Sequence, residues 1–289
     1  MKRIAILGCE NSHANAFLTA ISEKKEFSDV SVVGVYSDKR EASEKLNKKF
    51  GVPILENYAD AVSKIDGLII TARHGNNHYK YAKPYIESGV PMFIDKPITI
   101  SEAEAVEFMR ALKEHGIRIS GGSSLKQDVY VRKLKEEAVA EIGGKTIGGY
   151  VRAPYQSDSV YGGFYFYAQH MVEMVSEIFG RFPLSVTTKQ NGKQIHVLFH
   201  YENYDCVGLF CDKNNFYYVS RMSEGAASSY AIPTTNDWFY DEFAEFYGIL
   251  SGKEQTATYE EFAAPVFVMN AIERSLNSGK EEAVRKFEI

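Results

Sequence analysis

The chain has 289 residues, of which 45% are hydrophobic and 25% are charged, and its 33 basic and 38 acidic residues give a net charge of -5. This is the composition of an ordinary globular protein that is long enough for two domains. Because the sequence has no dense tract of lysine and arginine, we do not expect nucleic acid as a partner.

Cysteine usage and the first residues bear on the compartment. Cys9, Cys206 and Cys211 are an odd number without metal-like spacing, so neither a disulfide framework nor a zinc site is expected. The apolar run that starts at Ile4 is far too short for a signal or transmembrane segment. We therefore expect a cytoplasmic protein without a bound metal or a membrane partner.

The first half of the chain alternates apolar strands with helical patterns. We predict strands at 3–8, 30–35, 67–71, 92–94 and 117–120, and helices at 14–24, 41–50, 58–64, 79–88 and from Ser101 onward. This alternation predicts a doubly wound parallel sheet. Gly121-Gly122 marks its exit, which gives a first domain at residues 1–122.

The turn after the first strand is Gly8-Cys9-Glu10-Asn11-Ser12-His13. A dinucleotide fold holds the cofactor pyrophosphate at such a turn, against the helix N-terminus. Only the first glycine of the G-x-G-x-x-G fingerprint is present, because Glu10 and His13 occupy the other two places. A carboxylate at position 10 repels phosphate unless it points away or binds the substrate. The alternative for Glu10 and His13 is a helix start, capped by Ser12, with a local ion pair.

Two further turns carry polar residues. The second strand is followed by Ser37-Asp38-Lys39-Arg40, where an acid would hold a ribose 2′-OH and a base would accommodate a 2′-phosphate. The third is followed by a polar loop, 72–78, that contains His74 and His78. Since no third ligand is spaced to join these two histidines, capping of the next helix is the simpler role for them.

The fourth strand leads directly into Asp95-Lys96-Pro97. Pro97 ends the strand because it has no N–H to donate, which places Lys96 at a carboxyl end, where ligands bind in open α/β sheets. A lysine on a rigid strand end beside an acid can present one proton at a fixed place. The alternative is a surface lysine in a turn.

The second half has a different pattern, which we assign to a second domain at residues 123–289. A helix at 129–140 precedes strands near 184–189, 194–201, 205–212 and 214–221, with turns at Asn191-Gly192 and at 212–215. This order predicts an antiparallel meander with two distinct faces. The helices at 237–250 and 259–277 have no catalytic spacing, and we assign their aromatic residues to packing.

Gly162-Gly163 precedes a helix whose first turns contain His170. The nearby tyrosines 155, 161, 165 and 167 either line a pocket for a sugar-like or aromatic substrate or belong to the core. For His170, the alternative to a functional role is a histidine at a helix start.

Taken in order over nearly the whole chain, these motifs resemble the Gfo/Idh/MocA family of NAD(P)-dependent oxidoreductases. The resemblance implies a Rossmann domain followed by an α+β domain whose open-faced antiparallel sheet often forms the interface of a homodimer or homotetramer. The family motif Glu-Lys-Pro matches Asp95-Lys96-Pro97, and its lysine is catalytic. His170 matches a histidine near the nicotinamide, whereas Phe166 stands where the family has an aspartate and cannot exchange a proton.

The resemblance also implies which residues contact the cofactor. Ser37 takes the place of the usual acid, and the basic residues Lys39 and Arg40 follow it. This arrangement weakly favours NADP over NAD as the cofactor. Thr71 and His78 match a Thr-Pro-like turn, with Ala72 where the proline often stands. The full set implied at the dinucleotide is Gly8, Cys9, Glu10, Asn11, Ser37, Asp38, Lys39, Thr71, Ala72, His78 and Asp95.

The function implied is hydride transfer between NAD(P) and a carbinol or carbonyl of a small polyhydroxylated, sugar- or polyol-like substrate. Lys96 would give or take the hydroxyl proton, and His170 would orient the substrate or share the proton. One alternative is an enzyme that uses bound NAD for transient oxidation during glycoside cleavage. Another is a non-catalytic relative that binds a cofactor or ligand, which Glu10 and Phe166 favour and Lys96 and His170 oppose.

Overall fold

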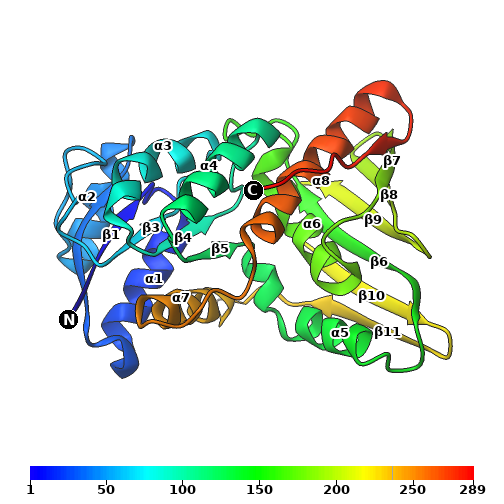
Figure 1. The fold of residues 1–289 in the computed structure, drawn as a ribbon, viewed down its shortest axis with the longest axis horizontal. Coiled ribbons are helices and arrows are strands. Elements are labelled where there is room, and N and C mark those ends of the chain that lie inside the picture. The colour runs from blue at the N-terminus through cyan, green and yellow to red at the C-terminus, as the bar shows by residue number, and fades with distance from the viewer. Residues whose placement is uncertain (236) are drawn as a thin grey trace.

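The computed structural model describes residues 1–235 and 237–289 and contains two sheets side by side (Figure 1). The first sheet has five parallel strands in the order β2-β1-β3-β4-β5. Their bounds are β1 (Lys2–Leu7), β2 (Val30–Tyr36), β3 (Gly67–Ile70), β4 (Met92–Asp95) and β5 (Ile119–Gly122). The predicted doubly wound sheet is therefore confirmed.

A parallel bridge between Val35 and Ile54 extends this sheet beyond β2. If the bridge is counted as the third segment along the chain, the spatial order becomes 3-2-1-4-5-6, which is that of a dinucleotide-binding sheet. The strand order reverses beside β1, so the carboxyl ends of β1 and β3 flank the crevice where ligands bind in such sheets.

Helices cover both faces of the first sheet. They are α1 (Ser12–Glu23), α2 (Arg40–Phe50), α3 (Asn76–Ala82) and α4 (Glu102–Glu114), with 3₁₀ turns η1 (Lys25–Phe27) and η2 (Lys83–Ser88). In Figure 1, α3 and α4 lie on one side of the sheet and α1 on the other. Alternate residues of β1 enter the two cores, Ile4 and Ile6 with the α1 side and Ala5 and Leu7 with the α4 side.

Two local predictions in this half are wrong. Residues 58–64 form turns rather than a helix, because Ser63 has a φ of +62° and the backbone bonds run from Val62 to Ala59 and from Lys64 to Ala61. Asn11 rather than Ser12 caps α1, since its side chain accepts from the Ser12 N–H at 2.7 Å. The predicted cap Ser101 of α4 is confirmed.

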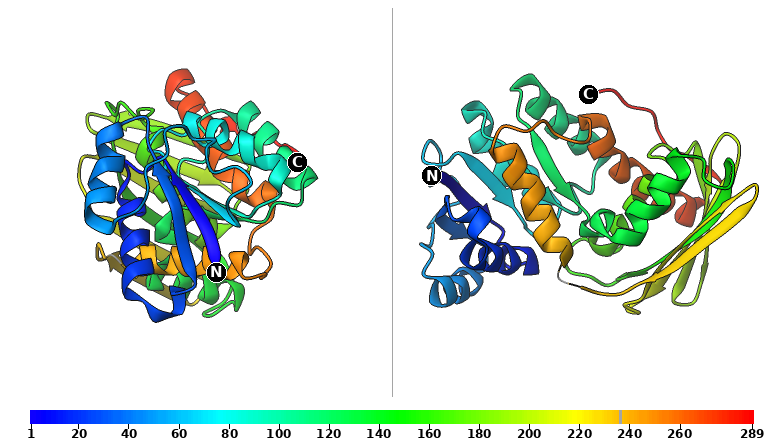
Figure 2. Two further views of the ribbon diagram at one scale, coloured as in Figure 1. Left: turned by 90° about the vertical axis from the view of Figure 1, so that its left-hand side faces the viewer. Right: turned by 90° about the horizontal axis from the view of Figure 1, so that it is seen from below.

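The second sheet has seven strands in the order β11-β10-β6-β9-β8-β7-β12. Helices α5 (Val129–Val139), α6 (Tyr165–Phe179) and α8 (Tyr259–Ser278) lie on the side facing the first sheet, and the outer face carries no helix of the described residues (Figure 2). The strands are β6 (Thr146–Tyr155), β7 (Ser185–Asn191), β8 (Gln194–His200), β9 (Asp205–Asp212), β10 (Tyr217–Ser223), β11 (Ala226–Ile232) and β12 (Glu282–Ala283).

The predicted antiparallel sheet is present, but its topology differs from a meander. The hairpin at Asn191-Gly192 joins β7 and β8 as predicted. Residues 212–215 do not close a second hairpin, because β6 lies between β9 and β10 and runs parallel to β9. A strand from much earlier in the chain thus fills the centre of the sheet, which local turn signals cannot reveal.

Helix α7 (Asp237–Leu250) returns to the first sheet. Phe243 lies 5.4 Å from Phe17, and Phe246 lies 6.3 Å from Phe93, measured between ring centroids. The right-hand view of Figure 2 shows α7, in gold, against the face that α1 also covers. We keep 1–122 and 123–289 as the proposed division of the chain, with α7 completing the core of the first unit. No helix of the described residues is both long and apolar enough to cross a membrane.

Candidate active site

A cavity of about 570 Å³ lies where the two units meet. The first unit contributes the start of α1, the loop after β3 and the end of β4, and the second contributes the start of α6 and residues around β10 and α7. Lys96, His170 and Asn11 all line it, so the two predicted catalytic residues share one cavity. Other lining residues are Arg73, Tyr161, Phe166, Tyr167, Lys213 and Trp238.

Lys96 follows β4 directly and is only 4% exposed, which rules out the surface-turn alternative. Its Nζ donates to the Phe166 carbonyl at 3.1 Å and lies 4.6 Å from the centre of the Phe166 ring. Burial lowers the pKa of Lys96, and the neighbouring Asp95 carboxylate only partly opposes this. The amine is therefore poised to exchange a proton.

Asp95 lies behind Lys96, is fully buried and does not line the cavity. Its carboxylate accepts from the Lys96 backbone N–H and from the Asn11 side-chain amide, each at 2.6 Å. Burial raises the pKa of Asp95 to about 6, while His13 and Lys96 oppose that shift. Asp95 thus joins the end of β4 and the turn after β1 into one rigid unit.

His170 lies in the second turn of α6, and its Nδ1 is 2.6 Å from the hydroxyl of Ser123. The Ser123 oxygen also accepts from the Leu125 N–H at 3.2 Å. When the serine donates to Nδ1, a neutral imidazole carries its own proton on Nε2. Burial, followed by the charge of Lys96, lowers the pKa of His170 well below its usual value, so the ring is neutral at pH 7.

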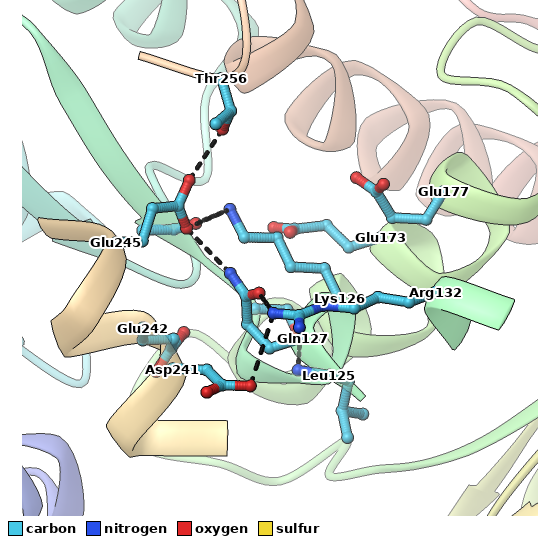
Figure 3. A network of polar contacts seen from close by, with 12 residues as sticks. Leu125, Lys126, Gln127, Arg132, Glu173, Glu177, Asp241, Glu242, Glu245 and Thr256 are labelled. Atoms are coloured by element: carbon cyan, nitrogen blue, oxygen red, sulfur yellow. Dashed lines mark hydrogen bonds and ion pairs between the residues drawn. The ribbon is translucent and has the colours of Figure 1, made fainter. Parts of the chain in front are cut away.

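A buried polar cluster extends from this site towards α7. The ring nitrogens of His13 lie 3.2 Å from Asp95 Oδ2 and 3.2 Å from Glu242 Oε2, although neither contact has hydrogen-bond geometry. Burial raises the pKa of Glu242 well above its usual value. Figure 3 shows Glu245 of α7 beside the Lys126 amine, Glu242 elsewhere on the same helix, and Glu173 of α6 opposite Glu245. The carboxyl groups next to His13 are thus distant from it in sequence, and burial lowers the pKa of its ring, so the predicted local ion pair is not formed.

Two glycines allow the strand ends to meet at the site. Gly8 has a φ of +78°, and a Cβ there would lie 2.3 Å from the backbone of Ala72. Gly121 has a φ of +121°, and a Cβ there would lie 2.0 Å from the Ile94 carbonyl oxygen. Only glycine fits both positions, so β1 packs against the β3 loop and β5 against β4.

Five of the residues implied at the cofactor belong to the support of the crevice. Thr71 donates to the Gly8 carbonyl, and Ala72 packs on Gly8. Cys9 contacts Ser43 in the core, and burial raises its pKa to about 11. The ring nitrogens of His78 lie 2.7 Å from the Ala72 carbonyl and 3.2 Å from the Ile98 carbonyl. Like Asp95, these four are less than 5% exposed.

The remaining implied residues surround the ends of β1 and β2. Glu10 Oε2 accepts from the Ser37 hydroxyl at 2.7 Å, and Glu10 Oε1 accepts from the Arg73 N–H at 3.1 Å. Asp38 accepts from the Tyr36 hydroxyl at 2.7 Å. Lys39 reaches across to the second unit, where its Nζ donates to the Tyr161 hydroxyl at 2.6 Å.

The four tyrosines separate into two pairs. Tyr161 and Tyr167 line the cavity with Lys96. Tyr155 and Tyr165 line a second cavity of about 680 Å³, where the Tyr165 hydroxyl donates to Glu273. Only the first pair therefore shares a cavity with Lys96.

Sequence reasoning missed Ser123 and Glu242. Ser123 carried a usable signal, because a serine right after a buried strand and a glycine pair stands at a strand's carboxyl end. Glu242 carried none, since an acid on an amphipathic helix is usually solvated.

The first unit matches a family of known proteins. Residues 2–123 match the family model described as "Oxidoreductase family, NAD-binding Rossmann fold", GFO_IDH_MocA. A search of curated proteins found no match.

Solved structures with the same fold cover the whole chain. A putative myo-inositol dehydrogenase from Sinorhizobium meliloti 1021 is 14% identical, with a TM-score of 0.85 over 99% of this chain and 100% of that one. A scyllo-inositol dehydrogenase from Lactobacillus casei, solved with bound NAD(H) and scyllo-inositol, is 14% identical, with a TM-score of 0.85 over 98% and 99%. A putative NADPH-dependent oxidoreductase from Desulfitobacterium hafniense DCB-2 is 14% identical, with a TM-score of 0.81 over 98% and 97%. At this identity the similarity establishes the fold.

Proposed function

Because residues 2–123 of this chain belong to the Gfo/Idh/MocA family of oxidoreductases with an NAD-binding Rossmann fold, we propose that the protein is an NAD(P)-dependent dehydrogenase. The reaction is hydride transfer between the cofactor and a carbinol or carbonyl carbon of a small polyhydroxylated compound. The observation that carries this proposal is the buried Lys96 amine, which shares a cavity with His170 at the carboxyl edge of the parallel sheet.

Lys96 exchanges the hydroxyl proton. In the oxidising direction, the substrate O–H proton passes to the neutral Nζ, and the carbonyl forms as the C–H bond breaks. A nicotinamide bound in the crevice would supply the acceptor for the hydride from that bond. Burial lowers the pKa of Lys96, which favours the neutral amine that this step requires.

His170 positions the substrate oxygen. The contact with Ser123 holds the ring in place, and donation from the serine hydroxyl to Nδ1 would leave Nε2 as a donor. A neutral donor can hold the hydroxyl before reaction and the carbonyl oxygen after it, without competing with Lys96 for the proton. Since Phe166 stands at the family's aspartate position, Lys96 is the group that moves the proton.

The crevice has the parts that a dinucleotide needs. Gly8 allows the close approach of β1 to the β3 loop, and Asn11 reaches the cavity from the turn before α1. Glu10, Ser37 and Asp38 surround the end of β2, where the ribose hydroxyls would be held. We assign these five residues to cofactor contact, and Cys9, Thr71, Ala72, His78 and Asp95 to the layer beneath them.

The cavity suits a polyol or a sugar. Tyr161, Tyr167 and Trp238 offer ring faces beside polar groups such as Lys96 and Asn11, as ligand sites for such compounds require. The bound scyllo-inositol of the Lactobacillus casei enzyme is a compound of this class.

We also propose a homo-oligomer that associates through the outer face of the second sheet. On that face, Val207 is 39% exposed and Met222 is 45% exposed. No helix of the described residues covers this face. Light scattering of the purified protein will give the assembly size, and a purely monomeric sample would refute the interface. We propose the cytoplasm as its location, because Cys9, Cys206 and Cys211 are free thiols.

The test of function is a screen of inositols, sugars and polyols with NAD and with NADP, read at the absorbance of the reduced nicotinamide. Net cofactor reduction with at least one compound supports the proposal. Release of an aglycone from glycosides without net reduction would favour transient oxidation instead. Cofactor binding without turnover of any compound, in either direction, would favour the non-catalytic alternative.

A further inference from the structure

The end of β2 holds a carboxylate that comes from a different strand. The Glu10 side chain crosses the end of β1 and is fixed at both oxygens, by the Ser37 hydroxyl at 2.7 Å and the Arg73 N–H at 3.1 Å. Ser37 is only 7% exposed and follows β2 directly. Its place is the one from which an acid holds the ribose 2′-OH in a dinucleotide fold. Glu10 therefore brings its charge to the position that Ser37 leaves neutral.

A second negative charge lies beside it. Asp38 accepts from the Tyr36 hydroxyl at 2.7 Å. Although burial opposes ionisation, the hydrogen bonds from Tyr36 and Tyr81 hold the pKa of Asp38 below its usual value. The end of β2 thus carries two acidic side chains, those of Glu10 and Asp38.

The basic residues that follow are engaged elsewhere. Lys39 Nζ donates to the Tyr161 hydroxyl and lies 4.8 Å from the centre of that ring, across the crevice. Arg40 pairs with Glu56 at 2.7 Å and with Glu44 at 3.6 Å. The two residues that lean towards NADP in the sequence therefore have acidic or aromatic partners of their own.

We propose that Glu10 is the specificity-determining residue for the cofactor and that it selects NAD over NADP. Its carboxylate accepts a hydrogen bond from the 2′-OH of NAD, whereas a 2′-phosphate brings like charges together. Glu10 stands where the fingerprint has its second glycine. The turn after β1 thus has an acid in place of a glycine, and this acid takes the role of the one missing at the end of β2. This inference rests on the proposed function, because it requires a dinucleotide in the crevice.

Calorimetric titration with NADH and with NADPH tests it without any substrate. The wild-type protein should bind NADH at least about tenfold more tightly than NADPH. Glu10→Gln keeps the size of the side chain and removes its charge. It should therefore lower the ratio of the NADPH to the NADH dissociation constant by about tenfold or more. Ser37→Ala removes the hydroxyl that holds the carboxylate and should narrow the ratio as well. Glu41→Gln changes the net charge equally at an exposed site on α2 and should keep the wild-type ratio.

Ionic strength gives a second reading. Salt screens charge repulsion, with a Debye length of about 10 Å at 0.1 M. The wild-type preference for NADH should therefore shrink between about 50 mM and about 500 mM salt. The preference of Glu10→Gln should change less. Thermal melting confirms that each variant is folded.

The outcomes separate the two proposals. Preference for NADPH, equal binding of both cofactors, or an unchanged ratio in Glu10→Gln would overturn the role of Glu10 and leave the dehydrogenase proposal standing. Binding of neither cofactor to a folded wild-type sample would overturn both.

Discussion

His13 and Glu242 meet at 3.2 Å although they lie near opposite ends of the chain, and both side chains are almost completely buried. The contact joins α1 to α7 beside Asp95, which supports Lys96. Both oxygens of Glu242 lack a hydrogen bond within the described structure. Burial disfavours the ionised form of a carboxyl, most of all one without a donor, and it raises the pKa of Glu242.

Glu242→Gln should change how stability depends on pH. The folded wild-type protein keeps the Glu242 proton above pH 4.5, where the unfolded chain releases it. The folded state therefore binds more protons, so stability is greatest at low pH and falls as the pH rises through the folded pKa. The glutamine variant does not lose stability in this way as the pH rises. Its Tm should exceed that of the wild type by a few degrees at pH 8 and by less at pH 5.

Thermal melts of both proteins from pH 5 to pH 8 will measure this. Glu44→Gln, a mostly exposed site on α2, serves as the matched control and should follow the wild-type curve. Parallel curves for Glu242→Gln and wild type would mean that Glu242 is ionised in the folded protein.

Lys96→Met should remove turnover while the protein stays folded. Loss of a proton acceptor lowers kcat by a factor of about 10² to 10⁴. Because the buried amine has a lowered pKa, its protonated form destabilises the fold, and methionine should raise the Tm at pH 7. Steady-state kinetics and thermal melts measure the two effects, with the exposed Lys45→Met as control. Undiminished kcat would remove Lys96 from the mechanism.

Phe166→Asp should shift the pH profile of kcat. The Phe166 ring is 4.6 Å from Lys96 Nζ, so a carboxylate there favours the protonated amine and raises the pKa of Lys96. Oxidation, which needs the neutral amine, should then require a higher pH, with the acidic limb moved by about one unit. Phe166→Asn is the control, because asparagine has the shape of aspartate without its charge. If both variants shift the limb equally, the effect is one of cavity size rather than charge.

Gly8→Ala should be far more destabilising than Gly51→Ala. Both glycines have positive φ, +78° and +71°, and alanine costs about 1–2 kcal/mol in that region. Only at Gly8 would an added Cβ also meet backbone, with Ala72 atoms 2.3 Å away, whereas nothing lies within 4 Å at Gly51. Urea unfolding should therefore give a loss of about 3 kcal/mol or more for Gly8→Ala. Equal losses would show that the loop after β3 yields easily.

Local patterns were enough for the first unit and for the ends of its strands. The apolar runs indicated β1 to β5, and the proline after Lys96 placed that lysine at a carboxyl edge, because both signals act over a few residues. His170 was indicated by its match, after Gly162-Gly163, to a histidine of the family it resembles. The turn at 58–64 was misjudged because its helical composition is overridden by the left-handed Ser63.

Contacts between distant segments explain what the sequence left hidden. The central place of β6 depends on pairing with β9 and β10, which come much later in the chain. The Glu242 contact depends on α7 returning to α1, and the engagement of Lys39 depends on Tyr161 from the other unit. No window of neighbouring residues contains these pairs, so periodicity cannot indicate them.

The return of α7 has a consequence for the order in which the protein folds during synthesis. Phe243 and Phe246 complete one face of the first sheet, so residues 1–122 alone, with α1, cover only part of that face. On the ribosome, the core on this face is completed only once residue 250 has emerged, by which time β6 to β11 have been made. The nascent first unit thus presents an apolar surface while most of the second unit is still being synthesised, and its folding rate is governed by a contact between distant parts of the chain.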